Sequence, residues 1–180
     1  MNQNLFFTPT DILLPAHADM RRWSVIACDQ FTADAGYWQA VQDTVGDAPS
    51  TLRLMLPEFY LGKCDEAAAT REIQQTMRRY LDDGVFRTVP HSLVLVQRTL
   101  PGGTVRCGIV GALDLEAYDY APDSVTPIRA TEGTVASRLP ARVRIRAAAA
   151  LEMPHIMVFY SDPEDTIRRE AQAAAGETLY

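Results

Sequence analysis

Two apolar segments of similar length flank a Pro-Gly-Gly turn near the middle of the chain. Residues 91–100 (HSLVLVQRTL) and 104–115 (TVRCGIVGALDL) are rich in β-branched side chains, and the tripeptide between them is a strong turn signal. This pattern predicts an antiparallel β-hairpin around residues 91–115. Gly108 and Gly111 interrupt the second segment, which indicates a bulge or the close approach of another backbone.

Helical patterns lie on both sides of this hairpin. Residues 33–45 place apolar side chains at helical intervals and end at Gly46, and a longer pattern of the same kind begins at Asp65 and ends at Gly84. A further helix is expected after residues 161–164, which have the spacing of a capping box. The expected fold class is therefore mixed α/β (α+β), a sheet with the hairpin and flanking helices. No linker or internal repeat divides the 180 residues, so a single domain is expected.

Shorter patterns predict the remaining elements. Asp29 directly follows the apolar run of residues 23–28, at the kind of strand end where α/β proteins commonly bind ligands. Buried strands are expected at residues 23–28, 50–56 and 153–160, and short helices at residues 129–139 and 140–151.

The net charge of the chain indicates which classes of binding partner are not expected. The 23 acidic residues outnumber the 17 basic ones, so the formal net charge is −6, and every basic residue except Lys63 is an arginine. A chain with this balance is not expected to coat nucleic acid or anionic lipid. Residues 129–146 depart from the balance, because they hold five arginines against Glu132 alone.

Targeting and redox signals favour the cytoplasm. The cysteines, Cys28, Cys64 and Cys107, form no CxxC pair, which argues against a disulfide framework and against a structural zinc site. The first 15 residues lack the pattern of a signal peptide, and the longest apolar run is too short to span a membrane. A cytoplasmic protein with reduced thiols, no membrane partner and no metal site is expected.

The arginines of residues 129–146 are candidate anion ligands, because a planar guanidinium pairs bidentately with phosphate or carboxylate. Two interpretations stay open. In the first, Arg129, Arg142 and Arg146 hold the phosphates of a ligand beside a predicted helix start. In the second, the arginines pair with the chain's many carboxylates or stay in water. The hydroxyl groups that would join the phosphate site are those of Thr131 and Thr134.

Five stretches of the chain resemble a known bacterial family. They are Asp11–Pro15 (DILLP), Trp23–Gln30 (WSVIACDQ), Gly46–Leu52 (GDAPSTL), Ile128–Thr134 (IRATEGT) and Leu151–Ile156 (LEMPHI). The family is domain-of-unknown-function family 1015, sometimes labelled SpoOJ/ParB-like, and the similarity runs along nearly the whole chain. Its members are longer and carry a later glycine–histidine motif that is not found here. The resemblance therefore implies an N-terminal portion of a larger protein, cut near Tyr180.

The ParB-like label implies nucleotide or phosphate handling, as an analogy between distant relatives. The favoured hypothesis is a kinase-like enzyme that transfers a phosphoryl group from a nucleotide, bound with Mg²⁺, to a small hydroxylated metabolite. Glu132 would orient a hydroxyl or a metal-bound water, and Asp29 would be the base. The alternatives are a nucleotide-binding regulatory module without turnover and, less favoured, a ParB-like DNA-associated protein. The missing C-terminal half would be a partner in each case.

Overall fold

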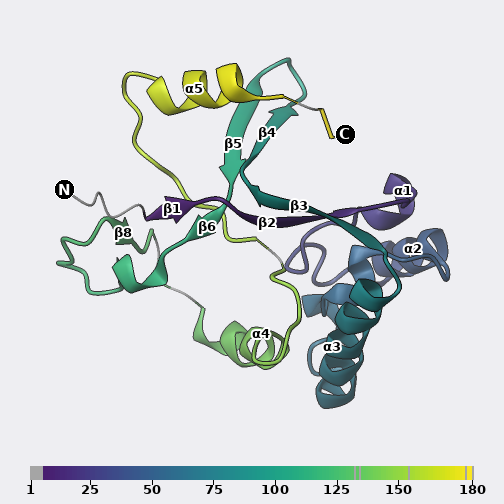
Figure 1. The fold of residues 1–180 in the computed structure, drawn as a ribbon. Helices are drawn as coiled ribbons and strands as arrows, with labels where there is room; N and C mark the ends of the chain where they lie inside the picture. Colours follow the sequence, from purple (N-terminus) through teal and green to yellow (C-terminus); the bar gives the residue numbers. More distant parts are fainter. Residues whose placement is uncertain (1–5, 132, 134, 154, 177, 180) are drawn as a thin grey trace. The chain divides into compact units, whose positions relative to one another are not determined.

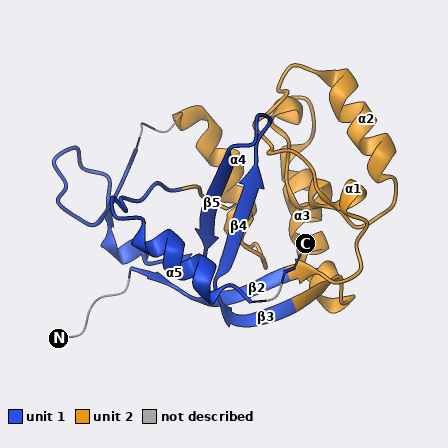
Figure 2. Ribbon diagram, turned by 90° about the horizontal axis from the view of Figure 1, so that it is seen from above, with its two compact units in different colours: residues 1–13, 88–133, 158–180 blue, residues 14–87, 134–157 orange. Residues whose placement is uncertain are grey.

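The structure of the protein is a computed structural model that describes residues 6–131, 133, 135–153, 155–176 and 178–179. It contains both helices and small antiparallel sheets, which confirms the mixed α/β class. The chain divides into two compact units (Figure 2). Unit 1 comprises residues 1–13, 88–133 and 158–180, and unit 2 comprises residues 14–87 and 134–157. The expectation of a single domain stays a prediction.

Unit 2 is mainly helical, and its helices begin where carboxylates cap them. The Asp34 carboxylate accepts a hydrogen bond from the backbone N–H of Tyr37 at 2.8 Å, and the Asp65 carboxylate accepts two from the first turn of α3 at 3.0 Å. Gly84 follows α3 with φ +67°, a conformation that favours glycine. The elements of this unit are α1 (Met20–Trp23), α2 (Ala35–Val45), η1 (Thr51–Leu54), η2 (Glu58–Tyr60), α3 (Glu66–Asp82), η4 (Ala136–Arg138) and α4 (Leu139–Arg146) (Figure 1).

The core of unit 2 forms around the apolar stripe of α3. The sequence places Ile73, Met77, Tyr80 and Leu81 on one helical stripe, and the first three are buried whereas Leu81 is exposed. Trp23 packs near the ring of Tyr80 with 6.3 Å between centroids. Trp38 of α2 is fully buried, and its indole N–H donates to the Phe31 carbonyl at 3.0 Å. The α3 helix therefore organises this unit.

The strands predicted at residues 23–28 and 50–56 are wrong. The first segment begins with Trp23, the last residue of α1, and continues as irregular chain, and the second is largely the 3-10 helix η1. The reason is side-chain hydrogen bonding: the Thr51 hydroxyl donates to the Trp23 carbonyl at 2.8 Å and accepts from the Val25 N–H at 3.2 Å. Ser50, which is fully buried, accepts from the Leu52 N–H at 3.2 Å. These contacts replace the backbone ladder that a strand would need.

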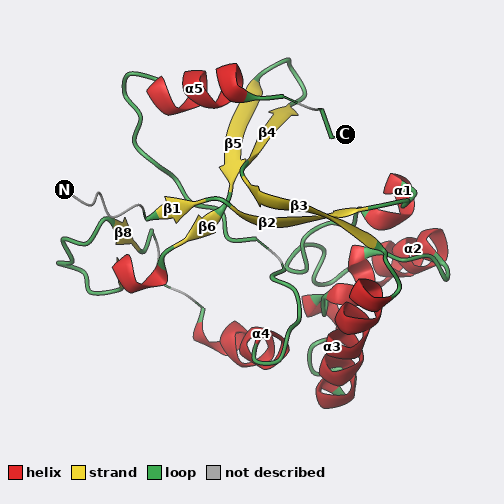
Figure 3. Ribbon diagram, in the orientation of Figure 1, coloured by secondary structure: helices red, strands yellow, loops and turns green. Residues whose placement is uncertain are grey.

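The strands of unit 1 include the predicted hairpin. β4 (Val94–Thr99) and β5 (Val105–Val110) pair antiparallel across the Pro-Gly-Gly turn. β1 (Phe7–Thr8) pairs antiparallel with β6 (Ala112–Leu113), and β7 (Tyr118–Asp119) pairs parallel with β8 (Ile128–Arg129). β2 (Thr10–Pro15) and β3 (Phe86–Ser92), which belong only in part to unit 1, form another two-stranded sheet (Figure 3). The remaining elements are η3 (Leu115–Ala117) and α5 (Thr166–Ala174).

The glycine prediction for the hairpin holds at one of its two positions. A Cβ on Gly111 would lie 2.7 Å from side-chain atoms of Leu93 and Phe7 and 2.8 Å from the Thr8 carbonyl oxygen. A Cβ on Gly108 would meet nothing within 4 Å. Gly111 is therefore the position where another backbone approaches closely.

Other sequence predictions fail in the last third of the chain. The described residues of the segment 153–160 form no strand, and Ile156, Met157 and Phe159 are largely exposed. The helix predicted at residues 129–139 is replaced by β8 and η4, and α4 covers only part of the predicted helix 140–151. No helix in the described part of the chain is long and apolar enough to cross a membrane.

Candidate ligand-binding site

Asp29 and Arg142, which the sequence selects separately, meet in unit 2 around Glu58. The Nη2 atom of Arg142 lies 2.9 Å from Glu58 Oε1 and 3.8 Å from Asp29 Oδ2. The Nε atom of Arg138 lies 3.4 Å from the other Glu58 oxygen. The Glu58 side chain is only 8% exposed, whereas both arginine side chains are about half exposed. These four residues, Asp29, Glu58, Arg138 and Arg142, are called the Glu58 centre below.

Backbone and helix contacts within unit 2 position this centre. The Glu58 N–H donates to the Cys28 carbonyl at 2.8 Å, which ties η2 to the chain beside Asp29. The side-chain amide of Gln74 on α3 donates to the carbonyls of Arg144 and Ile145 on α4, at 2.9 and 3.0 Å. Because these carbonyls lie near the end of α4, the contacts hold the helix that carries Arg142 against α3.

The electrostatics of the centre act on the half-buried Cys28. Burial is the largest effect on this thiol and raises its pKa above the ordinary value. The positive charge of Arg142 lowers the pKa, while the negative charges of Asp29 and Glu58 raise it. The net result is a pKa above the ordinary value for this thiol. The centre itself holds two carboxylates and two guanidinium groups, so its charges balance.

The N–H groups of Arg142 are only partly used. Both of its contacts involve Nη2, and no further partner of Arg142 occurs among the described residues. A guanidinium carries five N–H donors in a fixed plane. Arg142 can therefore donate to a bound anion from the part of its fork that Glu58 does not occupy.

The other predicted site residues do not join this centre as a group. Arg146 lies at the end of α4 and pairs with Glu152 at 2.8 Å. Arg129 belongs to unit 1, where its Nε donates to the Thr126 carbonyl at 3.1 Å, and Thr131 is an exposed residue of the same unit. Glu132 and Thr134 lie outside the described residues. Within residues 129–146, the arginines that pair with carboxylates are Arg138, Arg142, Arg144 and Arg146.

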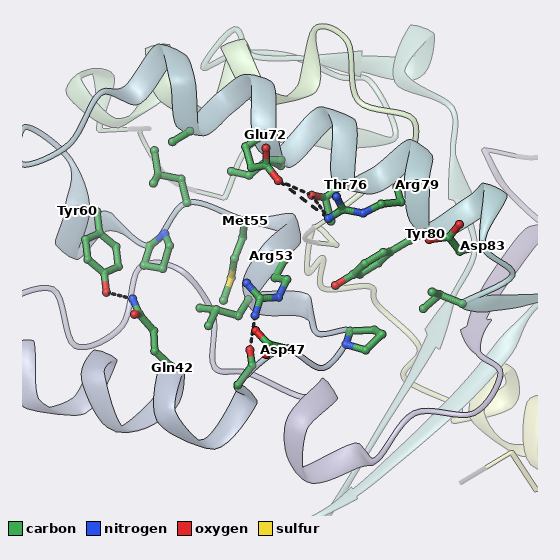
Figure 4. A pocket seen from close by; sticks show the side chains of 18 residues that line it. Gln42, Asp47, Arg53, Met55, Tyr60, Glu72, Thr76, Arg79, Tyr80 and Asp83 are labelled. Carbon is green, nitrogen blue, oxygen red and sulfur yellow. Dashed lines mark hydrogen bonds and ion pairs between the residues drawn. The ribbon is translucent and has the colours of Figure 1, made fainter.

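A separate groove in unit 2 was missed by sequence reasoning. It encloses about 730 Å³ between the end of α2, the chain from Gly46 to Pro57 and α3 (Figure 4). Arg53 lies near its middle, between Met55 and the turn that follows α2. The sequence signal available was weak, since Arg53 falls within the segment 50–56 that was predicted to be a strand. The Ser50–Thr51 hydroxyl pair is the local feature that indicates a capped helix there instead.

The described residues offer little to a metal ion. No group of three or more His, Cys, Asp or Glu side chains among them is arranged to hold one. A Mg²⁺ ion that arrives with a nucleotide needs only one or two protein carboxylates, because phosphate oxygens and water complete its coordination.

Comparison with known proteins places the chain in a family. Residues 9–180 match the family model described as "Protein of unknown function (DUF1015)". The match covers most of the sequence, so the chain belongs to this family. No curated protein and no solved structure matches the chain at the significance applied. The family resemblance seen in the sequence is therefore confirmed, and the function has to be argued from the site.

Proposed function

We propose that this member of the family handles a small phosphate-bearing ligand, a nucleotide or a phosphometabolite, at the Glu58 centre. The favoured form of the proposal is kinase-like phosphoryl transfer to a small hydroxylated metabolite. The observation that supports it is the distance of 3.8 Å between Asp29, a candidate base, and Arg142, a candidate phosphate ligand. Phosphoryl transfer depends mainly on positioning and charge stabilisation, so a base beside a guanidinium is a suitable starting arrangement.

Arg142 and Asp29 would have different roles in this reaction. Arg142 would donate the N–H groups not used by Glu58 to phosphate oxygens, for which its planar fork is well shaped. The Asp29 carboxylate would accept the proton of the attacking hydroxyl. Its Oδ1 already accepts from the Gln30 amide at 3.2 Å, which helps to orient the group. Mg²⁺ bound with a nucleotide would neutralise part of the phosphate charge.

A second candidate function, a nucleotide-binding regulatory module without turnover, is favoured by the pairing at Glu58. A phosphate that binds Arg142 or Arg138 competes with the Glu58 carboxylate for the same guanidinium groups. Ligand binding would therefore exchange one set of ion pairs for another and shift the position of α4. Such a differential contact is what a ligand needs to bias a conformational equilibrium.

The first experiment measures anion binding by thermal shift and calorimetry, with ATP, ADP and inorganic pyrophosphate as probes. We expect each probe to stabilise the protein, and Arg142→Gln to lower its affinity by about tenfold, since hydrogen bonds to charged groups are strong. Arg106→Gln in the β5 strand of unit 1 is the matched control and should leave the affinity unchanged. Failure of every anion to bind would contradict both candidate functions.

The second experiment separates the enzyme from the regulatory module. Phosphorylated product is sought with ATP and small hydroxylated acceptors. Asp29→Asn should abolish turnover while ATP still binds if the chain is an enzyme. Binding without product from any acceptor, together with faster amide exchange in α4 when ATP is present, would favour the regulatory module.

The ParB-like association and the N-terminal placement rest on the resemblance alone. A DNA-associated role is the least supported proposal, because the net charge is −6 and Arg138, Arg142 and Arg144 pair with carboxylates. Salt-dependent binding to duplex DNA would favour it. If the chain is the N-terminal portion of a longer protein, the extended protein should bind the nucleotide probes more tightly than residues 1–180.

A further inference from the structure

The groove in unit 2 has the volume of a small-molecule site. Its volume of about 730 Å³ lies within the range of roughly 300–1,000 Å³ that such sites occupy. Its lining is mixed, with apolar side chains mainly from η1 and the chain after it, and with polar and charged side chains that include Asp47, Glu72 and Asp83 (Figure 4). The apolar lining includes Leu52, Met55, Leu56, Pro57, Ile73 and Val85.

Arg53 forms no ion pair in the described part of the chain, although the carboxylates of Asp47, Glu72 and Asp83 also line the groove. Its Nη2 donates to the Gly46 carbonyl and its Nε donates to the Ala48 carbonyl at 3.4 Å. No Asp or Glu oxygen in the described part of the chain lies within ion-pair distance of it, although Arg79 in the same groove lies 4.0 Å from Glu72. The carbonyls orient the guanidinium without neutralising it. The charge is therefore fixed in place and open to an anion.

The backbone around Arg53 is itself well anchored. The buried hydroxyl of Ser50 accepts from the Leu52 N–H, which caps η1 at its start. The Ser50 N–H donates to the Tyr80 hydroxyl at 3.1 Å. These contacts tie the short helix that carries Arg53 to α3, so a ligand would meet a preformed group.

A second donor lies in the same groove. The Gln42 amide donates to the Tyr60 hydroxyl at 2.6 Å, so that hydroxyl acts as an acceptor there and keeps its own hydrogen for another partner. Figure 4 shows Tyr60 and Gln42 on one side of Arg53 and Tyr80 on the other. The groove thus combines a fixed cation, a hydroxyl donor and an apolar wall.

We propose that this groove binds a small ligand with an oxyanion head, a carboxylate or a phosphate, and a compact apolar body. The head pairs with Arg53 and accepts from Tyr60, and the body covers the wall that Met55 and Ile73 help to form. The proposal is independent of the Glu58 centre, because none of the four residues of that centre lines the groove.

The experiment uses four probes that separate head from body. Benzoate and phenyl phosphate carry both, whereas acetate and inorganic phosphate carry the head alone. Binding is followed by titration with NMR, using the resonances of groove residues. We expect benzoate or phenyl phosphate to bind more tightly than its head-only counterpart, by about tenfold for the buried ring. The comparison between the two tells which oxyanion the groove prefers. Failure of all four probes to perturb the groove would overturn the proposal.

Variants locate the bound head. Arg53→Gln should weaken binding of the preferred probe by about tenfold, while Arg71→Gln on α3 should leave it unchanged. Equal affinity in Arg53→Gln and the unsubstituted protein would overturn the proposal. Because Arg53 also contacts backbone carbonyls, Tyr60→Phe is the second variant, which keeps the ring and removes the donor. It should weaken binding several-fold, and unchanged affinity in it would also count against the proposal.

Discussion

The two units differ in how they are held together. Every buried side chain in the described part of the protein belongs to unit 2, and the described residues of unit 1 are all half-buried or exposed. Unit 2 has a helical core, whereas unit 1 relies on two-stranded pairings that are marginal in isolation. The lesson is that the same chain contains one region stabilised by burial and another stabilised mainly by backbone pairing and turn geometry.

The largest expected effect tests the core of unit 2. Trp38→Ala removes a fully buried ring and its hydrogen bond to the Phe31 carbonyl, and it should lower the free energy of unfolding by about 3–5 kcal/mol. Urea denaturation measures this change. The matched variant in unit 1 is Val105→Ala, whose side chain is half exposed, and it should change stability by about 0.5 kcal/mol or less. Similar losses in the two variants would remove the distinction between the units.

The next effect tests unit 1 at its tightest backbone contact. Gly111→Ala places a Cβ 2.7 Å from Leu93 and Phe7 atoms and 2.8 Å from the Thr8 carbonyl oxygen, so the backbone of β1 must shift. The cost should be about 1–3 kcal/mol. Hydrogen exchange should show faster exchange in β1 and β6 and little change in α3. Gly108→Ala, where a Cβ meets nothing within 4 Å, is the control and should leave exchange unchanged. Faster exchange throughout α3 would mean that the two units unfold together.

A smaller effect is expected at the Glu58 centre. Glu58→Gln keeps the shape of a nearly buried side chain but removes the charge that Arg138 and Arg142 share. The loss of stability should be about 1–2 kcal/mol, reduced from the value for a fully buried pair because both arginines are about half exposed. Exchange should speed up in α4 and η4. An unchanged exchange rate there would show that the ion pairs do not hold the segment 134–157.

The elements that the sequence predicts well are those whose signals are local. The helices that start after Asp34 and Asp65 are capped by side chains two or three residues away, and Gly46 and Gly84 mark their ends. The hairpin at residues 91–115 is of the same kind, because its turn and its strands are adjacent in sequence. In these elements the hydrogen-bond partners of the backbone groups lie within the same short segment of the sequence.

The failures come from partners that are distant in sequence. The apolar run at residues 23–28 is typical of a strand, but the backbone groups of Trp23 and Val25 bond to the Thr51 hydroxyl. Asp29 and Arg142 were selected as site residues for separate reasons, and Glu58, which joins them, carries no distinctive pattern. Arg53 was missed because its role depends on the Gly46 and Ala48 carbonyls of a turn that only the structure reveals.

The smallest expected effect is on the alkylation rate of Cys28 in unit 2, compared with that of Cys107 in unit 1. Burial raises the pKa of Cys28, so less of the reactive thiolate is present at a given pH. Arg142→Gln removes a positive charge that lowers this pKa and should slow alkylation of Cys28 by iodoacetamide. Glu58→Gln removes a negative charge that raises the pKa and should speed it. Cys107 in unit 1 should react at the same rate in all three proteins. If both variants change the alkylation rate of Cys28 in the same direction, the cause is altered access to the thiol and not the charges of the Glu58 centre. If the rate at Cys107 changes as well, the effect is not confined to unit 2.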